Sequence, residues 1–160
     1  MLYFAYGSNL NPGQMQRRCP GAQPVGRAVL HAWQLIMTTK GTANIVRAPG
    51  KTLHGAVWRF LPHHLALMDR WEGVAHRANR RAWLRLTLPD GSECAAVTYI
   101  GVRNWPGPGK PHYIVGAMLK GAAAFELPRS YQEEIRQWLP RRPTGSNQQY
   151  RGRRTRKLIR

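Results

Sequence analysis

The first stretch of the chain whose residue types could do chemistry is a five-residue loop, Tyr6, Gly7, Ser8, Asn9 and Leu10. It follows a short apolar run at residues 2–5 and precedes an Asn-Pro pair typical of a helix start, so we expect a turn between a strand and a helix. Glycine lets a ligand approach the main chain closely, and short Ser and Asn side chains donate and accept hydrogen bonds. The loop could hold a small anionic or zwitterionic group, although the same residue types are also the commonest in ordinary turns.

Glu72 is the carboxylate whose position separates it from the other six acids of the chain. Leu61, Leu65, Met68 and Glu72 follow one another at spacings of four, three and four, which predicts one helical face. Three of the four are apolar, so we expect this face to point inward, with Glu72 in the last turn before Gly73. Partly apolar surroundings raise the pKa of a carboxyl group toward the range of about 6–7 that suits proton transfer.

Nearby arginines favour a second interpretation of Glu72, in which the carboxylate is paired with an arginine and closes the helix end. The same positive charges oppose a rise in its pKa. The candidates for this pairing are Arg70, Arg77, Arg80 and Arg81.

Other residues with metal or redox chemistry lack useful spacing. The six histidines show no ligand pattern, and Cys19 and Cys94 do not form a metal-spaced pair, so we expect no metal site and see no requirement for a disulfide. No nucleotide-binding glycine loop is present. Aromatic residues fall at positions typical of a core, which argues against a stacking surface for bases.

The patterning along the chain predicts an α+β fold, a small mixed barrel or curled sheet with helices inserted and a helical C-terminal third. We expect about six strands, mostly in antiparallel hairpins, with a turn at residues 48–50 between the third and fourth and another at 89–91 before the last. The expected strands are residues 2–6, 25–39, 44–46, 53–60, 80–88 and 94–102. The expected helices are residues 12–18, 61–71, 112–125 and 128–139.

The length of 160 residues suits one domain, which we place at residues 1–139, followed by a basic tail at 140–160. The tail carries eight basic residues and no acid from residue 141 onward, and its composition is typical of disorder. No apolar run is long enough to span a bilayer, and no signal peptide is evident, so a cytoplasmic location is expected.

The charge balance is strongly basic, with 25 Lys and Arg against seven acids, a net +18. Residues 1–140 still carry 17 bases and seven acids, a net +10. Such a surface favours nucleic acid or another polyanion as a partner. A non-catalytic binding module that uses this charge, and the Arg-rich tail, is therefore the alternative to an enzyme.

Four motifs, in order, resemble the γ-glutamylcyclotransferase-like family, which includes the AIG2-like proteins and γ-glutamylamine cyclotransferases. Residues 3–10 (YFAYGSNL) resemble its signature opening, and residues 41–58 resemble its next block. Residues 67–74 (LMDRWEGV) resemble the segment with the family's catalytic glutamate, and residues 111–131 resemble its C-terminal pattern. The similarity covers roughly residues 1–139.

The resemblance implies a small mixed β-barrel flanked by helices and an enzyme that needs no cofactor. It implies that the loop at residues 6–10 binds a γ-glutamyl group, chiefly through main-chain groups, and that Glu72 is the general acid/base. Tyr113 would line the pocket. The implied reaction is intramolecular: the α-amine of a small γ-glutamyl substrate attacks the γ-carbonyl and leaves 5-oxoproline and a free amine. A held geometry and one proton-carrying carboxylate are sufficient for such a ring closure.

Two positions depart from the family pattern. Many relatives carry a tyrosine about seven residues after the glutamate, where this chain has Asn79. The usual serine three residues before the Tyr113 position is replaced by Lys110. We therefore expect a retained site with a different pocket wall, which leaves the identity of the leaving amine open.

Overall fold

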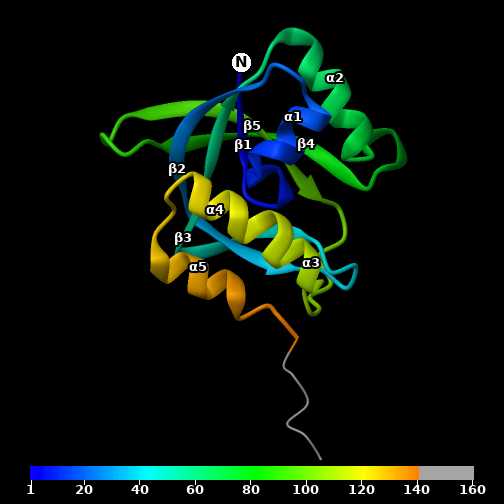
Figure 1. Ribbon diagram of the computed structural model, residues 1–160, viewed down its shortest axis with the longest axis vertical. Helices are drawn as coiled ribbons and strands as arrows, with labels where there is room; N and C mark the ends of the chain where they lie inside the picture. Colours follow the sequence, from blue (N-terminus) through cyan, green and yellow to red (C-terminus); the bar gives the residue numbers. More distant parts are fainter. Residues whose placement is uncertain (141–160) are drawn as a thin grey trace, which may run out of the picture.

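Residues 1–140 are described by a computed structural model in which five strands close into a barrel with helices packed outside it (Figure 1). The strand order is β1-β3-β2-β4-β5, and closure comes from a parallel contact between β1 and β5 beside otherwise antiparallel pairs. This confirms the predicted mixed, mostly antiparallel barrel. The strands are β1 (Leu2–Ala5), β2 (Gln23–Met37), β3 (Ala43–Arg59), β4 (Asn79–Thr87) and β5 (Glu93–Gly101).

The prediction of six strands was wrong, because β3 runs without a break through the turn expected at residues 48–50. Arg47 pairs with Trp33 and Thr52 with His31, so residues 48–51 lie opposite the single residue Ala32. A bulge of this kind absorbs extra residues while the strand continues, and it accommodates Pro and Gly inside a strand. The predicted turn at residues 89–91 does join β4 to β5.

The helices lie at the predicted places but differ in extent. The helix expected at residues 112–125 is three consecutive pieces whose middle part is a π-helix, and the last helix ends at Arg136. In Figure 1, α3 and α4 run across the front of the barrel with α5 beneath them, while α1 and α2 lie together at the upper right. The helical segments are η1 (Ser8–Leu10), α1 (Pro12–Arg18), α2 (Pro62–Trp71), η2 (Val74–His76), α3 (Pro111–Tyr113), η3 (Ile114–Leu119), α4 (Lys120–Ala124) and α5 (Arg129–Arg136).

Local capping explains where α1 and α2 begin and end. The Asn11 side chain accepts a hydrogen bond from the Gln14 N–H at 3.1 Å, as an N-cap residue does, and Pro12 is the first helical residue. Helix α2 ends at Trp71, and Gly73 follows with φ of 63°, a left-handed conformation that favours glycine. These two helices confirm the expected bounds of 12–18 and 61–71 closely.

The inward face of α2 differs from the prediction at one position. Leu61 is 49% exposed, because it precedes the helix with extended dihedrals and so does not continue the helical face. His64 takes its place in the buried stripe with Met68. The His64 ring is satisfied inside the protein: Nδ1 accepts the Leu61 N–H at 3.1 Å, and Nε2 lies 2.9 Å from the Pro20 carbonyl oxygen.

The core fills the barrel and continues under the C-terminal helices, with Phe4, Trp58, Phe60, Ile114 and Met118 almost completely buried. Helix α4 packs directly against the end of η1, since a Cβ at Gly121 would lie 2.2 Å from the Leu10 carbonyl carbon. The expectation that aromatic residues occupy core positions fails for three tryptophans: Trp71, Trp83 and Trp105 are 58%, 60% and 71% exposed. Among the described residues, no helix is long and apolar enough to cross a membrane.

Candidate active site

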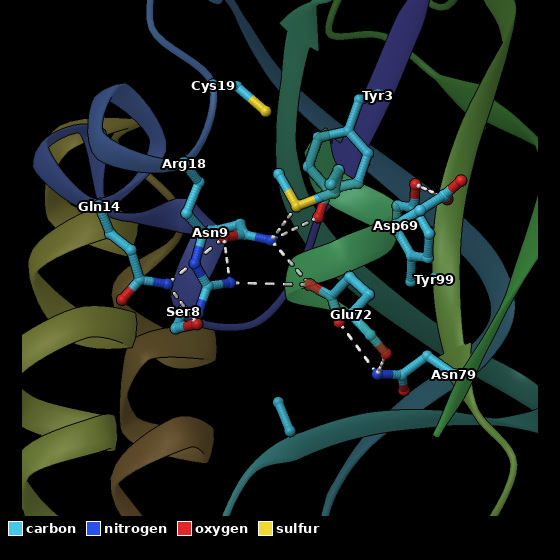
Figure 2. A network of polar contacts seen from close by, with 12 residues as sticks. Tyr3, Ser8, Asn9, Gln14, Arg18, Cys19, Asp69, Glu72, Asn79 and Tyr99 are labelled. Carbon is cyan, nitrogen blue, oxygen red and sulfur yellow. Dashed lines mark hydrogen bonds and ion pairs between the residues drawn. The ribbon is translucent and has the colours of Figure 1, made fainter. Parts of the chain in front are cut away.

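Glu72 lies at the end of α2 with its carboxylate held from two sides (Figure 2). On one side the Asn9 amide nitrogen donates to Oε1 at 3.1 Å and also reaches the Tyr3 hydroxyl oxygen at 2.8 Å. On the other side the Asn79 amide nitrogen donates to Oε2 at 3.0 Å and to the Glu72 carbonyl oxygen at 2.8 Å. The loop after β1 and the start of β4 therefore fix the orientation of one carboxylate.

Arg18, from the last turn of α1, is the cation nearest to this carboxylate. Its guanidinium donates to the Asn9 Oδ1 at 2.8 Å and lies 3.7 Å from the Glu72 Oε1. By holding the Asn9 oxygen, Arg18 directs the Asn9 amide nitrogen toward Glu72. The arginines proposed from the sequence as partners of Glu72 form no salt bridge with it, and Arg81 instead pairs with Asp69.

Burial raises the pKa of Glu72 above its ordinary value of 4.5, whereas the Arg18 charge and the Asn9 hydrogen bond lower it; burial prevails. The side chain is only 19% exposed. A carboxyl group with a raised pKa accepts and returns a proton near neutral pH more readily than an ordinary surface glutamate. Glu72 thus lies inward, as expected, and its pKa is raised, which is the direction expected for a carboxyl group in partly apolar surroundings.

The glycine in the loop is required for space. A Cβ at Gly7 would lie 2.8 Å from the Tyr113 hydroxyl oxygen and 3.2 Å from the Ala43 Cβ. The close approach of the Tyr113 hydroxyl oxygen and of the Ala43 Cβ therefore explains the glycine.

The remaining loop residues have distinct roles. The Tyr6 hydroxyl donates to the Tyr99 carbonyl oxygen at 2.5 Å, which ties the loop to β5. The Ser8 Oγ accepts a hydrogen bond from the Gln14 side chain at 2.6 Å, and Leu10 is fully buried in the core.

Tyr113 connects the C-terminal helices to the loop. Its hydroxyl oxygen accepts the backbone N–H of Ser8 at 3.2 Å and that of Ala43 at 3.3 Å. Burial raises the pKa of Tyr113, and burial likewise raises the pKa of Tyr3 and Tyr6. All three phenols therefore stay neutral around Glu72: Tyr6 donates its proton to the Tyr99 carbonyl oxygen, and Tyr3 and Tyr113 each retain a proton that they can donate.

These groups enclose a cavity of about 40 Å³. Four of the residues predicted from the loop and helix patterns line it, Tyr6, Gly7, Asn9 and Glu72, as does Tyr113, which the family resemblance implied. Ser8 and Leu10 do not line the cavity; their side chains anchor the loop through Gln14 and through the core. The complete lining is Tyr3, Tyr6, Gly7, Asn9, Ala43, Glu72, Tyr99 and Tyr113.

Sequence reasoning did not identify Tyr3, Arg18, Ala43 or Tyr99 as site residues. Tyr3 could have been found from the sequence, because it places a hydroxyl in an otherwise apolar strand. A buried tyrosine hydroxyl usually has a polar partner, which indicates polar groups nearby. Arg18 gave no local signal, because it meets Glu72 only through the packing of α1 beside α2. Asn79 was noted only as a departure from the family pattern, yet its amide holds one oxygen of the carboxylate.

No group of three or more His, Cys, Asp or Glu side chains that could hold a metal ion occurs within residues 1–140. Cys19 is buried, Cys94 is half-buried, and both are free thiols. The cavity itself is lined by one buried carboxylate, phenols, an amide and main-chain groups.

The structure combines a closed mixed barrel with one buried carboxylate, Glu72, beside a strand-to-helix loop. Comparison with known protein families shows which class of enzyme has this arrangement. The profile of the γ-glutamyl cyclotransferase, AIG2-like family matches residues 3–116. The chain belongs to this family of enzymes. Both halves of the site, the loop at residues 6–10 and Glu72, fall inside the matched part.

Individual relatives agree with the family assignment. The γ-glutamylcyclotransferases of Homo sapiens and Mus musculus are each 29% identical to this chain, over 90% and 84% of it and over 81% and 77% of their own lengths. A solved structure of a γ-glutamyl cyclotransferase superimposes with a TM-score of 0.83 at 28% identity, covering 91% of this chain and 92% of the other. YkqA from Bacillus subtilis, 24% identical, shares the fold with a TM-score of 0.75 over 86% of this chain and 53% of its own.

Proposed function

We propose that this protein is a cyclotransferase that converts a γ-glutamyl amine or γ-glutamyl amino acid to 5-oxoproline and a free amine, with Glu72 as the general acid/base. The observation that carries the proposal is the Glu72 carboxylate, which burial gives a raised pKa and which Asn9 and Asn79 hold beside the loop at residues 6–9. The names of the relatives support the same reaction class.

The reaction needs two proton transfers, one from the attacking nitrogen and one to the leaving nitrogen, both of which bond to the γ-carbonyl carbon. The neutral α-amine forms a bond to the γ-carbonyl carbon, and a proton from this nitrogen passes to Glu72. The bond from the same carbon to the leaving nitrogen then breaks, and Glu72 gives the proton to the departing amine. The carboxylate ends the cycle as it began, so one residue with a pKa between those of ordinary acids and amines is sufficient.

The neighbours of Glu72 have complementary roles in this proposal. The Tyr113 phenol, neutral because burial raises its pKa, can donate to the carbonyl oxygen as negative charge develops there. The loop main chain holds the glutamyl α-amine and α-carboxylate, which gives the five-membered ring its near-attack geometry. Asn9 and Asn79 keep the two carboxylate oxygens in fixed directions.

The test is release of 5-oxoproline from a panel of γ-glutamyl compounds by the full chain and by Glu72→Gln, which keeps the shape of the side chain. Loss of a general acid/base typically costs about 10²–10⁴-fold in rate, and we expect a fall of that size. Retained activity in Glu72→Gln would reject the role of that residue. No 5-oxoproline from any compound would reject the reaction.

A further inference from the structure

A second and much larger cleft, of about 470 Å³, lies beside the catalytic cavity. Ala43 lines both spaces, and Asn79 lines the cleft while its amide holds the Glu72 Oε2. Ligand sites for small molecules usually measure about 300–1,000 Å³, so the cavity of about 40 Å³ at Glu72 cannot hold a whole substrate. A γ-glutamyl group at Glu72 would direct its leaving amine past Ala43 and Asn79 into the cleft.

The cleft is positively charged. Lys40, Arg77 and Arg103 line it together with His76, and no Asp or Glu is among its lining residues. Among residues 1–140, none of these three permanent cations takes part in a salt bridge, in contrast to Arg81 or Arg85. Three unpaired positive charges around one concave site favour an anionic ligand.

The three cations come from separate segments that the fold brings together. Lys40 lies in the turn between β2 and β3, Arg77 follows η2, and Arg103 lies in the loop after β5. This loop is fastened to the β2–β3 turn, because the Thr39 N–H donates to the Trp105 carbonyl oxygen at 2.9 Å and the Gly107 N–H to the Met37 carbonyl oxygen at 2.9 Å. Main-chain hydrogen bonds thus fix two walls of the cleft relative to each other.

Trp105 adds an apolar surface to the same cleft. The residue is 71% exposed, which is unusual for a tryptophan, and it lines the cleft together with the cations. The indole provides a flat face for the carbon skeleton of a ligand, while the cations contact its anionic groups.

We propose that this cleft binds the leaving amine of the substrate and selects amines that carry two or more negative charges, such as an amino dicarboxylate or a phosphorylated amine. The inference rests on the cyclotransferase function proposed above and specifies its substrate class. One carboxylate can engage one or two of the three cations, and a second anionic group is needed to use the rest.

Matched substrate pairs test the proposal in the full chain. γ-Glutamyl-glutamate and γ-glutamyl-glutamine have nearly the same shape and differ by one charge, and γ-glutamyl-O-phosphoserine compared with γ-glutamyl-serine tests phosphate in place of carboxylate. We expect the charged member of at least one pair to have about tenfold higher kcat/KM, the usual effect of one charge-assisted hydrogen bond. The pair with the larger ratio identifies which anion the cleft recognises.

Variants connect this ratio to the cleft. In Arg103→Gln and Lys40→Gln the charged-to-neutral ratio of kcat/KM should fall toward one. Arg59→Gln is the matched control and should keep the ratio, because Arg59 is exposed and pairs with Leu2, at the end of β1 away from the loop. Equal turnover within both pairs, or a ratio that Arg103→Gln leaves unchanged, would overturn the proposal while leaving the cyclotransferase activity intact.

A binding measurement separates this proposal from the function on which it rests. Tryptophan fluorescence of the full chain is titrated with O-phosphoserine and with glutamate, with Trp105→Phe used to assign the signal. Saturable binding that Arg103→Gln weakens about tenfold supports an anion site even if no γ-glutamyl compound is cyclised. If neither anion binds and no compound is cyclised, both proposals fail.

Discussion

Glu72 experiences two opposing influences on its charge, and they come from different elements. Its own burial at the end of α2 raises its pKa, while Arg18 from α1 lowers it. The acidic limb of the pH dependence of kcat/KM reports the essential base of the free enzyme. We predict that Arg18→Met raises the pKa of Glu72 further, moves this limb to higher pH and reduces activity most on its acidic side.

Two further variants isolate the charge of Arg18 from its position. Arg17→Met removes the same charge from the neighbouring, exposed position of α1 and should leave the limb in place. Arg18→Lys keeps the charge but not the planar fork that holds Asn9, so the limb should move less than in Arg18→Met. A limb that shifts to lower pH in Arg18→Met would contradict this account.

The raised pKa of Glu72 also has a consequence for stability. Because the folded protein holds the proton more tightly than the unfolded chain, ionisation of Glu72 lowers the free energy of unfolding. This penalty is absent below the unfolded-state pKa and complete above the folded-state pKa. The stability of Glu72→Gln relative to wild type should therefore rise between about pH 4 and about pH 8, on top of a pH-independent cost that arises because the Gln amide nitrogen faces one of the two Asn donors. Urea unfolding across this range measures it; a variant destabilised most at pH 8 would contradict the sign.

Gly7 is the residue at which one methyl group should disturb the reaction. Gly7→Ala places a Cβ 2.8 Å from the Tyr113 hydroxyl oxygen, so the phenol must move. A displacement of about 1 Å in a positioned group can cost about 10²-fold in rate, and we predict a loss of that order in kcat. The double variant Gly7→Ala/Tyr113→Phe removes the shorter of the two close contacts, that with the Tyr113 hydroxyl oxygen, and leaves the 3.2 Å approach to the Ala43 Cβ. It should regain thermal stability but not activity; recovery of activity would show that the hydroxyl is dispensable.

At the scale of elements, the site depends on the packing of α4 against the loop after β1. A Cβ at Gly121 would lie 2.2 Å from the Leu10 carbonyl carbon and 2.5 Å from the Asn11 nitrogen, both main-chain atoms that cannot rotate away. Overpacking of this kind typically costs about 1–3 kcal/mol, and we predict that loss in the free energy of unfolding of Gly121→Ala.

Gly116→Ala is the control for this prediction, because a Cβ there meets nothing within 4 Å. It should be neutral or stabilising by up to about 1 kcal/mol, the usual gain from Gly to Ala in a helix. Chemical denaturation of both variants decides the comparison. Equal stability of Gly121→Ala and wild type would mean that α4 can move away from the loop at no cost.

At the scale of the whole molecule, the net charge of +18 comes from 25 Lys and Arg against seven Asp and Glu. We propose that the basic surface gives the protein salt-dependent affinity for polyanions, including nucleic acid. The predicted disordered tail lies outside the described residues, but the sequence places eight of the 25 basic residues there. A chain ending at residue 140 should bind single-stranded nucleic acid more weakly than the full chain.

The measurement is a binding titration at several salt concentrations. Phosphate contacts release counterions, and six to ten of them make affinity fall about 10³–10⁵-fold between 50 and 200 mM salt. The full chain should show the steeper dependence on salt. Binding that is indifferent to salt, or equal in both chains, would rule out this use of the charge.

The sequence by itself determined the features that depend on local contacts. Asn11 and Gly73 correctly marked the start of α1 and the end of α2, because capping contacts are made within a few residues. Helical spacing correctly predicted that Glu72 lies on the inward side. Period-two alternation correctly placed β4, and the turn at residues 89–91 correctly placed β5 as its partner strand. The same local signals misjudged residues 48–50, since a Pro-Gly turn and a bulge inside a long strand differ only in what pairs beside them.

Only the tertiary structure decided the surroundings of Glu72 and the space next to it. Arg18 and Asn79 reach the carboxylate from α1 and β4, and the Tyr3 hydroxyl on β1 accepts a hydrogen bond from the Asn9 amide that also holds it, through helix packing and barrel closure that connect residues far apart in the chain. The charged cleft also exists only where the β2–β3 turn, η2 and the loop after β5 converge. Such contacts follow from how the elements pack together, and no spacing within a single segment encodes them.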